Sequence, residues 1–349
     1  MHIKHHSNVR DFLRRGLASA FCAFALITGL PAGAQELEKV RIAHSTESLA
    51  FLPFFTAVTM DKFKEVGIDV EVIRAGGGSK TIAAIVGGST DLAVSSTSGL
   101  MFARKEGIDI KMTSALVNQY VVNIVYSKQW AEKHAITADS SYEDRLKALR
   151  GARIATSGPG GGQDIVMYMA AKAGLDGERD LTMVHLGNDI GVYRAALDAG
   201  QIDGLALSAP TPEIAIKEQG AQWAFNFSTG EVSELNGYLY LVASASQAWL
   251  AKNPETARKV DQAFQATLDL LHDPAQSPIA RDKVRAKYYP DTDEALFAVV
   301  WDQAVKMTPR STRITVADVE GVVRFTNEFE KKNPLSMEDA AQAVLQLAN

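Results

Sequence analysis

The residues with the clearest chemical potential form a glycine-rich turn, "SGPGGGQD", at positions 157–164. It follows a short apolar run typical of a strand and precedes a run with a helical pattern from Gln163. Backbone N–H groups in the first turn of a helix attract negative charge, and glycines allow a ligand to approach them closely. The turn therefore predicts a negatively charged ligand at this helix N-terminus, either a nucleotide or something smaller.

Residues with hydroxyl or amide side chains, and glycines, also follow most other expected strands. Such residues often only cap helices, but together they contain no acid–base pair, no activated nucleophile and no metal-ligand spacing. They are more typical of a binding site than of an enzyme, and we expect no catalytic residue, metal or cofactor. The loops that contain them are residues 44–46, 76–79, 95–98, 157–163, 188–189 and 208–211.

The elements that must position these loops alternate between strands and helices, which predicts an α/β fold with parallel sheets. After residue 246 the chain is nearly all helix, and we expect this tail to pack against one of two α/β units. Ser140 and Glu143 fit a capping box for one helix. The expected strands are 40–45, 68–75, 90–96, 109–116, 121–127, 152–157, 181–186, 202–208, 222–227 and 237–243; the helices before the tail are 51–67, 80–86, 99–107, 141–150, 163–173, 191–200 and 211–219.

Residues 75–96 align without gaps with residues 187–208, so that Asp91 matches Asp203. Any β-α-β unit has a similar pattern, but the alignment also fits two similar lobes with equivalent loops. Loops at the carboxyl ends of strands bind ligands in open α/β sheets, so two such lobes would form a cleft. We interpret Asp91 and Asp203 as residues that fix turns.

The first residues have the composition of a secretory signal peptide. Basic residues precede an apolar run at 17–30 that is too short to span a membrane, and Ala34 fits a cleavage site. We therefore expect residues 1–34 to be removed and the protein to be periplasmic; the export route stays open. Removal of a net +3 changes the formal net charge from −5 to −8, which argues against nucleic acid or an anionic membrane as partner. The sole cysteine, Cys22, lies in this segment, so the mature chain has no thiol chemistry.

Three motifs in order carry a resemblance: "GGGS" followed by G-x-x-D (76–91), "LRGARIATSGPG" (149–160) and "AGQIDGLALSAP" (199–210). The chain closely resembles the periplasmic solute receptors of ABC importers for alkanesulfonates, taurine, nitrate and thiamine-type pyrimidines. The resemblance implies a two-lobed periplasmic-binding-protein fold (type II) that is hinged, with a helical C-terminal segment. The implied lobes are 36–118 plus 247–349, and 119–246.

The resemblance also implies a function and a set of contacts. We expect a monomeric receptor that captures a small, anionic organic molecule and delivers it to an inner-membrane permease with its ATPase. Some relatives have an acidic residue where Ala209 and Pro210 stand here, so a ligand amine would lack that partner. The implied ligand contacts are Ser45, Thr46, Gly78, Ser79, Ser95, Ser96, Ser157, Gly158, Gly160, Gly161 and Ser208, to which the loops add Asn188.

Three other classes of protein compete with this interpretation. A dinucleotide enzyme would need a third glycine where Gln163 stands, and a phosphate loop would need glycine where Ser79 stands. The pyrimidine-synthesising enzyme of the same fold relies on cysteines and histidines that this chain lacks. A receptor for another importer or for signalling needs the same cleft and stays open, as do sulfonate, carboxylate, nitrate and a neutral heterocycle as ligand.

Overall fold

The computed structural model describes residues 36–187 and 189–345, so the predicted signal peptide and Asn188 lie outside the described residues. The strands are β1 (Glu38–His44), β2 (Ile68–Arg74), β3 (Leu92–Ser96), β4 (Ile110–Gln119), β5 (Val122–Tyr126), β6 (Arg153–Thr156), β7 (Thr182–His185), β8 (Gly204–Ser208), β9 (Gln222–Phe225) and β10 (Asn236–Ser246). The helices are η1 (Leu49–Phe51), α1 (Leu52–Thr59), α2 (Lys62–Glu65), α3 (Gly78–Val86), α4 (Thr97–Lys105), α5 (Lys128–Lys133), α6 (Tyr142–Lys147), α7 (Gly162–Lys172), α8 (Ile190–Asp198), α9 (Thr211–Gln219), η2 (Phe227–Thr229), η3 (Ser233–Leu235), α10 (Gln247–Lys252), α11 (Pro254–Leu271), α12 (Ser277–Tyr288), α13 (Glu294–Lys306), α14 (Val316–Phe329) and α15 (Met337–Ala343).

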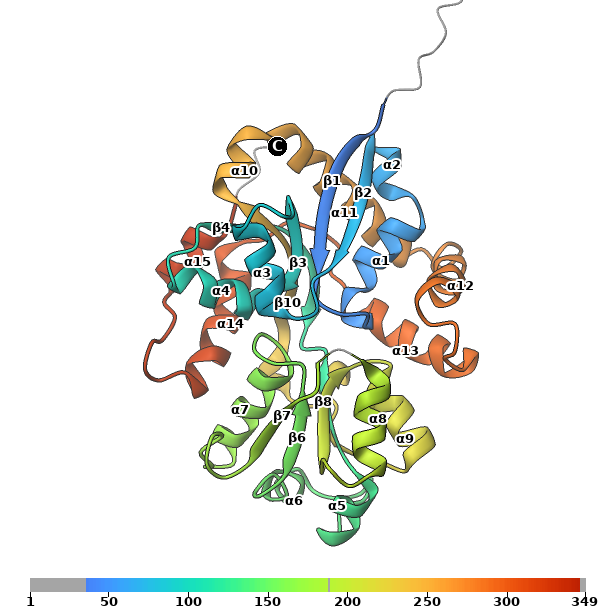
Figure 1. The fold of residues 1–349 in the computed structure, drawn as a ribbon, viewed down its shortest axis with the longest axis vertical. Helices are drawn as coiled ribbons and strands as arrows, with labels where there is room; N and C mark the ends of the chain where they lie inside the picture. The colour runs from blue at the N-terminus through green and yellow to red at the C-terminus, as the bar shows by residue number, and fades with distance from the viewer. Residues whose placement is uncertain (1–35, 188, 346–349) are drawn as a thin grey trace, which may run out of the picture. The chain divides into compact units, whose positions relative to one another are not determined.

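Two five-stranded sheets organise these elements, and helices flank both of them (Figure 1). The first sheet has the strand order β2-β1-β3-β10-β4, and the second has the order β7-β6-β8-β5-β9. The interior strands β3 and β5 consist almost entirely of buried residues. Such continuous burial is expected where helices cover both faces of a sheet. The predicted α/β fold class is confirmed.

Both sheets are mixed, so the prediction of parallel sheets is only half right. The pairs of β1 with β2 and β3, and of β6 with β7 and β8, are parallel. However, β10 runs antiparallel to β3 and β4, and β5 runs antiparallel to β8 and β9. These pairings join segments far apart in sequence, and strand–helix alternation does not encode them. The predicted lobe boundaries stay a prediction. Strand β10 falls within the segment 119–246 that is predicted as one lobe, but it belongs to the first sheet.

Two local predictions need correction. The expected helix 51–67 is interrupted at Asp61, whose φ of 55° is left-handed; aspartate tolerates this conformation better than most residues. The break leaves α2 as a separate turn in which Phe63 meets Phe264 of α11, with ring centroids 5.3 Å apart. The predicted capping box is one residue out of place. Ser141, not Ser140, is the N-cap of α6.

The helical tail contacts elements of both sheets, although we expected it to pack against one unit. Helix α11 packs on α1 and β4, whereas α14 lies against both β10 and α7 (Figure 1). Phe325 of α14 stacks on Tyr168 of α7 at 4.7 Å between ring centroids, and it lies 5.1 Å from both Tyr120 and Tyr238. Aromatic pairs at this spacing stabilise beyond their buried area. This aromatic cluster therefore places α7 in contact with elements of the first sheet.

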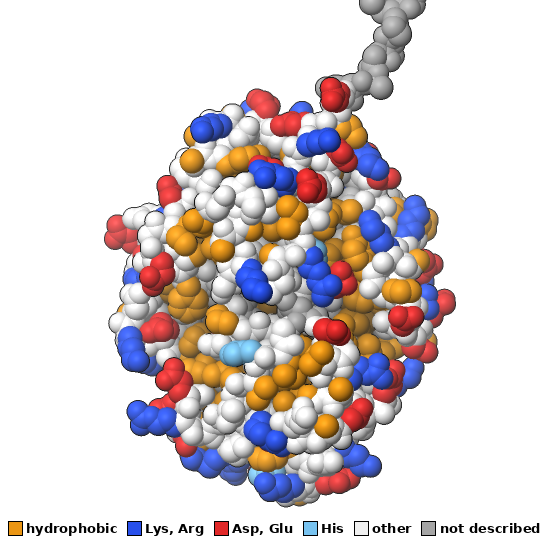
Figure 2. Space-filling model, viewed as in Figure 1, with side chains coloured by type: hydrophobic (Ala, Val, Ile, Leu, Met, Phe, Trp, Pro, Cys, Tyr) orange, Lys and Arg blue, Asp and Glu red, His pale blue; other side chains and the backbone are white. Residues whose placement is uncertain are grey.

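The face of the molecule drawn in Figure 2 shows no patch of a single charge. Figure 2 shows basic and acidic side chains interspersed on the face drawn. Across the described residues, no helix has the length and apolar character needed to cross a membrane.

Candidate functional site

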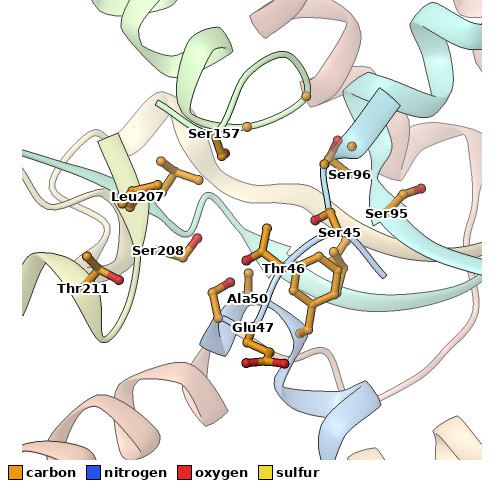
Figure 3. A pocket seen from close by; sticks show the side chains of 18 of the residues that line it. Ser45, Thr46, Glu47, Ala50, Ser95, Ser96, Ser157, Leu207, Ser208 and Thr211 are labelled. Carbon is orange, nitrogen blue, oxygen red and sulfur yellow. The ribbon is translucent and has the colours of Figure 1, made fainter. Parts of the chain in front are cut away.

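A pocket lies where the loops that follow β1, β3, β6 and β8 meet. These loops stand at the carboxyl ends of strands, which is where open α/β sheets bind ligands. Ser45, Ser95 and Ser96 approach from one side of the pocket, and Ser208 and Thr211 approach from the other (Figure 3). The cavity has a volume of about 70 Å³. Elements of both sheets therefore contribute to one small, hydroxyl-rich pocket.

The structure brings most of the predicted site residues together. Ser79 and Gly158 are not among the residues that line the pocket, and Asn188 lies outside the described residues. The predicted residues that line it are Ser45, Thr46, Gly78, Ser95, Ser96, Ser157, Gly160, Gly161 and Ser208. Whether they contact a ligand stays a prediction.

Five helices begin at the pocket. The lining includes the first residue or the N-cap of α3, α4, α7, α8 and α9, namely Gly78, Ser96, Gly161, Ile190 and Thr211. Unpaired N–H groups at a helix N-terminus attract negative charge, and each terminus contributes about 0.3–1 kcal/mol in exposed sites. The first turns of α3 and α4 contain no acidic residue that would cancel this effect, whereas at α8 the carboxylate of the N-cap residue Asp189 accepts a hydrogen bond from the backbone N–H of Gly191.

The glycine turn requires glycine for two different reasons. Gly160 has a φ of +83°, and a Cβ there would lie 2.8 Å from Oγ of Ser96. A Cβ on Gly162 would lie 2.3 Å from the carbonyl oxygen of Ala206 in β8. Gly160 therefore allows the turn to meet the start of α4; a Cβ on Gly99 of that helix would lie 3.7 Å from Cα of Gly160. Gly162 allows α7 to pack closely on its sheet.

One hydroxyl of the lining lacks a partner. Ser95 is only 3% exposed, and its Oγ forms no hydrogen bond with any described residue. A buried hydroxyl without a partner costs free energy. Ser95 can therefore donate to a ligand atom without giving up an existing hydrogen bond.

Of the described residues that line the pocket, Glu47 is the one with a charge. Its carboxylate pairs with Arg74 at 3.5 Å, and both side chains are a little less than half exposed. Among the described residues, the lining contains no lysine, arginine or histidine. Any anion bound here must consequently be held by backbone N–H groups and hydroxyls.

A buried carboxylate lies directly behind the glycine turn. Asp164 of α7 accepts hydrogen bonds from Oγ of Ser98 at 2.9 Å and from the backbone N–H of Gly160 at 3.0 Å. It is 3% exposed, and burial raises its pKa to about 6 despite these two hydrogen bonds. Asp164 thus connects the turn before α7 to the first turn of α4.

A second carboxylate of this kind occurs in the first turn of α9. Oε2 of Glu213 is buried and has no hydrogen-bond partner among the described residues. The N-cap of this helix is Pro210, which lacks the N–H that a capping box would use. Burial raises the pKa of Glu213 to about 7.

His44 and the aromatic residues beside it have structural roles near the pocket. His44 is buried against Phe51, Phe54 and Phe55, and its Nδ1 donates to the carbonyl of Thr46 at 3.0 Å. Burial lowers the pKa of His44. Phe51 lines the pocket, whereas Phe54 belongs to the core. His44 therefore fixes the loop that carries Ser45 and Thr46.

Asp91 and Asp203 fix turns, as predicted. Asp91 receives hydrogen bonds from Nε and Nη2 of Arg41 at 3.1 and 2.8 Å. Asp203 receives the same pair from Arg153 at 2.8 and 2.7 Å. Burial alone would raise the pKa of each aspartate, but the hydrogen bonds from arginine lower it. Neither aspartate lines the pocket.

The sequence predictions missed several residues of this region, including four with titratable side chains. Glu47, Tyr193 and Tyr240 line the pocket, and Asp164 supports it. An acidic residue in the first turn of a helix is a recognisable signal, so Asp164 could have been found. Tyr240 lies on β10, and its pairing with the first sheet has no local signature.

Solved structures of solute-binding proteins have the same fold. The alkanesulfonate-binding protein SsuA from Xanthomonas axonopodis pv. citri, bound to MOPS, is 18% identical with a TM-score of 0.69, covering 89% of this chain and 99% of SsuA. SsuA from Escherichia coli, an aliphatic sulphonate-binding protein, is 16% identical with a TM-score of 0.65, covering 88% and 92%. The nitrate-binding protein NrtA from Synechocystis PCC 6803 is 14% identical with a TM-score of 0.60, covering 78% and 70%. The predicted periplasmic-binding-protein fold is therefore confirmed.

Sequence comparison gives a relationship at the level of family. Over 258 residues the chain is 25% identical to YtlA of Bacillus subtilis (strain 168), a protein whose name assigns it a binding role without a ligand, and the match covers 72% of each protein. Residues 33–281, more than half of the chain, match the model of the NMT1-like family. The chain belongs to the NMT1-like family.

Proposed function

We propose that this chain is a periplasmic solute receptor that captures a small anionic organic molecule, sulfonate-like or carboxylate-like, and delivers it to an ABC permease with its ATPase. The observation that carries the proposal is the convergence of five helix N-termini on one pocket without a basic side chain. Several such termini together with hydroxyl donors can hold an anion without lysine or arginine.

The chemistry of the lining supports binding rather than catalysis. Apart from Glu47, which is engaged with Arg74, the lining side chains are hydroxyls, aromatic rings and aliphatic groups. None of them forms an acid–base pair or a nucleophile with an adjacent base of the kind that hydrolases and transferases need. We therefore assign the protein no enzymatic activity.

The relatives support the same class of function. SsuA of Xanthomonas axonopodis binds alkanesulfonates and NrtA binds nitrate, as their names state, and both share the fold. We propose that the two sheets are the cores of two lobes, that the lobes close over the ligand, and that residues 1–34 direct export. Differential contacts in the closed form would then favour closure.

A thermal-shift screen tests the ligand class. Ethanesulfonate, benzoate, acetate, nitrate and a neutral pyrimidine are each added to the full chain, and a ligand that binds the native state raises the Tm by mass action. We expect ethanesulfonate or one of the carboxylates to raise it. A response to the pyrimidine alone would contradict the anionic class, and no response to any compound would contradict the proposed receptor for small anions.

A pair of variants tests the site. Ser157→Asp adds a negative charge to the pocket wall and should abolish binding of the responding anion while the protein stays folded. Ser89→Asp adds the same charge at an exposed position before β3 and should leave binding unchanged. Unchanged affinity in Ser157→Asp would remove the glycine turn from the site.

A receptor of another importer or of a sensor system has the same site, so a separate measurement is needed. Co-purification of the chain with a membrane permease and an ATPase would support the ABC assignment. Recovery with a sensor kinase instead would contradict it.

A further inference from the structure

The carboxylate of Asp164 lies between elements of the two sheets. It belongs to α7, which packs on β6 and β8 of the second sheet. Its partner Ser98 belongs to α4, which packs on β3 and β10 of the first sheet. On its own side, the backbone N–H of Gly160 donates to the other carboxylate oxygen.

The groups that surround Asp164 leave its charge uncompensated. Three tyrosines face it, namely Tyr120 between β4 and β5, and Tyr238 and Tyr240 on β10, and the pKa of each is raised by burial first and by Asp164 second. In the described part of the chain, no lysine, arginine or histidine forms an ion pair with Asp164. The ionised carboxylate thus has only two hydrogen bonds to replace its hydration.

We propose that Asp164 is a positioning residue of the candidate site that links two events. When the first-sheet elements close onto the glycine turn, the carboxylate of Asp164 takes up a proton. Ser98, Tyr238 and Tyr240 all come from first-sheet elements, so separation of the two sheets would expose the carboxylate to water. Burying an ionised carboxylate without a cation is costly, and protonation removes that cost. The buried arrangement therefore binds a proton more tightly than an exposed one.

The pKa supports this argument. In this buried arrangement the pKa of Asp164 is about 6, compared with 3.8 for an unperturbed aspartate. Between these two values a closing molecule takes up a proton, and closure becomes more favourable as the pH falls. An anion bound on the pocket side of Gly160 would add a second negative charge near Asp164, which strengthens the same coupling.

The experiment measures closure directly and requires no ligand. The proposal rests on the proposed receptor function only in assuming that the two sheets can separate. Failure to find a solute would therefore leave this test intact. The full chain carries Cys22→Ser together with Val192→Cys on α8 and Ile279→Cys on α12, both at exposed positions. A donor and an acceptor dye on these cysteines report the separation of the two halves from pH 8 to pH 5.

We expect energy transfer to rise as the pH falls, with a midpoint at or below pH 6. Asp164→Asn should give high transfer and a flat profile. Ser98→Ala should lower energy transfer at pH 8 and so enlarge the change between pH 8 and pH 5, because the Ser98 hydroxyl stabilises the ionised form of the buried carboxylate. Glu213→Gln is the matched control, since it removes a different buried carboxylate with a raised pKa and should keep the wild-type profile.

A flat wild-type profile, or a pH dependence that survives in Asp164→Asn, would overturn the proposal. A profile lost in Glu213→Gln and kept in Asp164→Asn would do the same. If Asp164→Asn fails to fold, a ¹³C titration of the Asp164 carboxyl in the wild-type protein decides the question. A midpoint near pH 6 supports the proposal, and a midpoint near 4 contradicts it.

Discussion

Arg153 donates two side-chain hydrogen bonds to the carboxylate of Asp203, and its backbone N–H donates a third at 2.9 Å. Arg41 and Asp91 repeat this arrangement, with a backbone bond of 2.8 Å. In both pairs the two residues are 50 positions apart. The two sheets therefore contain the same anchor between a strand and the turn before its neighbour.

The first prediction concerns this anchor. Asp203→Asn removes the charge from a half-buried bidentate pair and should lower the free energy of unfolding by about 1–3 kcal/mol. Asp91→Asn should cost a similar amount, because the geometry is the same. Urea denaturation measures both values. A large cost in one variant and none in the other would contradict the structural equivalence.

The second prediction concerns the contact between the glycine turn and α4. Gly160→Ala places a methyl group against Ser96 and should weaken binding of the solute found by the screen at least about tenfold. Gly174→Ala is the control, since its φ of +66° gives the same backbone strain with nothing within 4 Å of the added Cβ. Both should lose about 1 kcal/mol of stability. Isothermal titration should show weaker binding only for Gly160→Ala; equal affinities would contradict a role for this contact.

The third prediction concerns the unpartnered hydroxyl of Ser95. Ser95→Ala should leave the Tm unchanged or slightly higher, because it removes a buried group without a partner. It should weaken solute binding about five- to tenfold, as expected for the loss of one hydrogen bond. Thr90→Val removes another buried, unpartnered hydroxyl that does not line the pocket and should leave affinity unchanged. Full affinity in Ser95→Ala would show that the ligand does not use this group.

The fourth prediction concerns the pH dependence of stability, to which two buried groups contribute with opposite signs. Burial lowers the pKa of His44, so its contribution is present above about pH 6.5 and is lost as the pH falls below that value. Burial raises the pKa of Asp164 from 3.8 to about 6, so stability falls by about 3 kcal/mol as the pH rises across that interval.

Matched variants separate these two contributions. The free energy of unfolding is measured by urea denaturation between pH 4 and pH 8. His44→Gln should remove the loss at low pH and retain the Asp164 contribution, whereas Asp164→Asn should do the reverse. A variant with the same slope as wild type over its interval would show that its residue does not titrate as stated.

The sequence predicted where most elements lie, because their signals are local. Helix α9 begins and ends where expected, and Ser336 caps the last helix with Asp339. The predicted helix boundaries are wrong where the conformation or hydrogen bond of a single residue sets the boundary. Asp61 adopts a left-handed conformation that divides a helix, and the hydroxyl of Ser141, rather than that of its neighbour, accepts the bond from Asp144.

The loops that form the site were predicted from the sequence, but the aromatic wall of the pocket and the buried carboxylate behind it were not. Serines and glycines after strands are visible in sequence, so Ser45, Ser96 and Ser208 could be expected together. The aromatic wall and the buried carboxylate depend on tertiary packing. Tyr240 reaches the pocket because β10 pairs antiparallel with β3, and Asp164 is buried because α4 supplies Ser98.

The two arginine–aspartate anchors have a consequence for the evolvability of the fold. They lie before the amino ends of β3 and β8, whereas the pocket lies beyond the carboxyl ends of the same strands. The residues that fix strand positions are therefore separate from the residues that meet a solute. Loops such as the one after β8 can exchange serine for other side chains, and so change what is recognised, without disturbing what keeps each sheet folded.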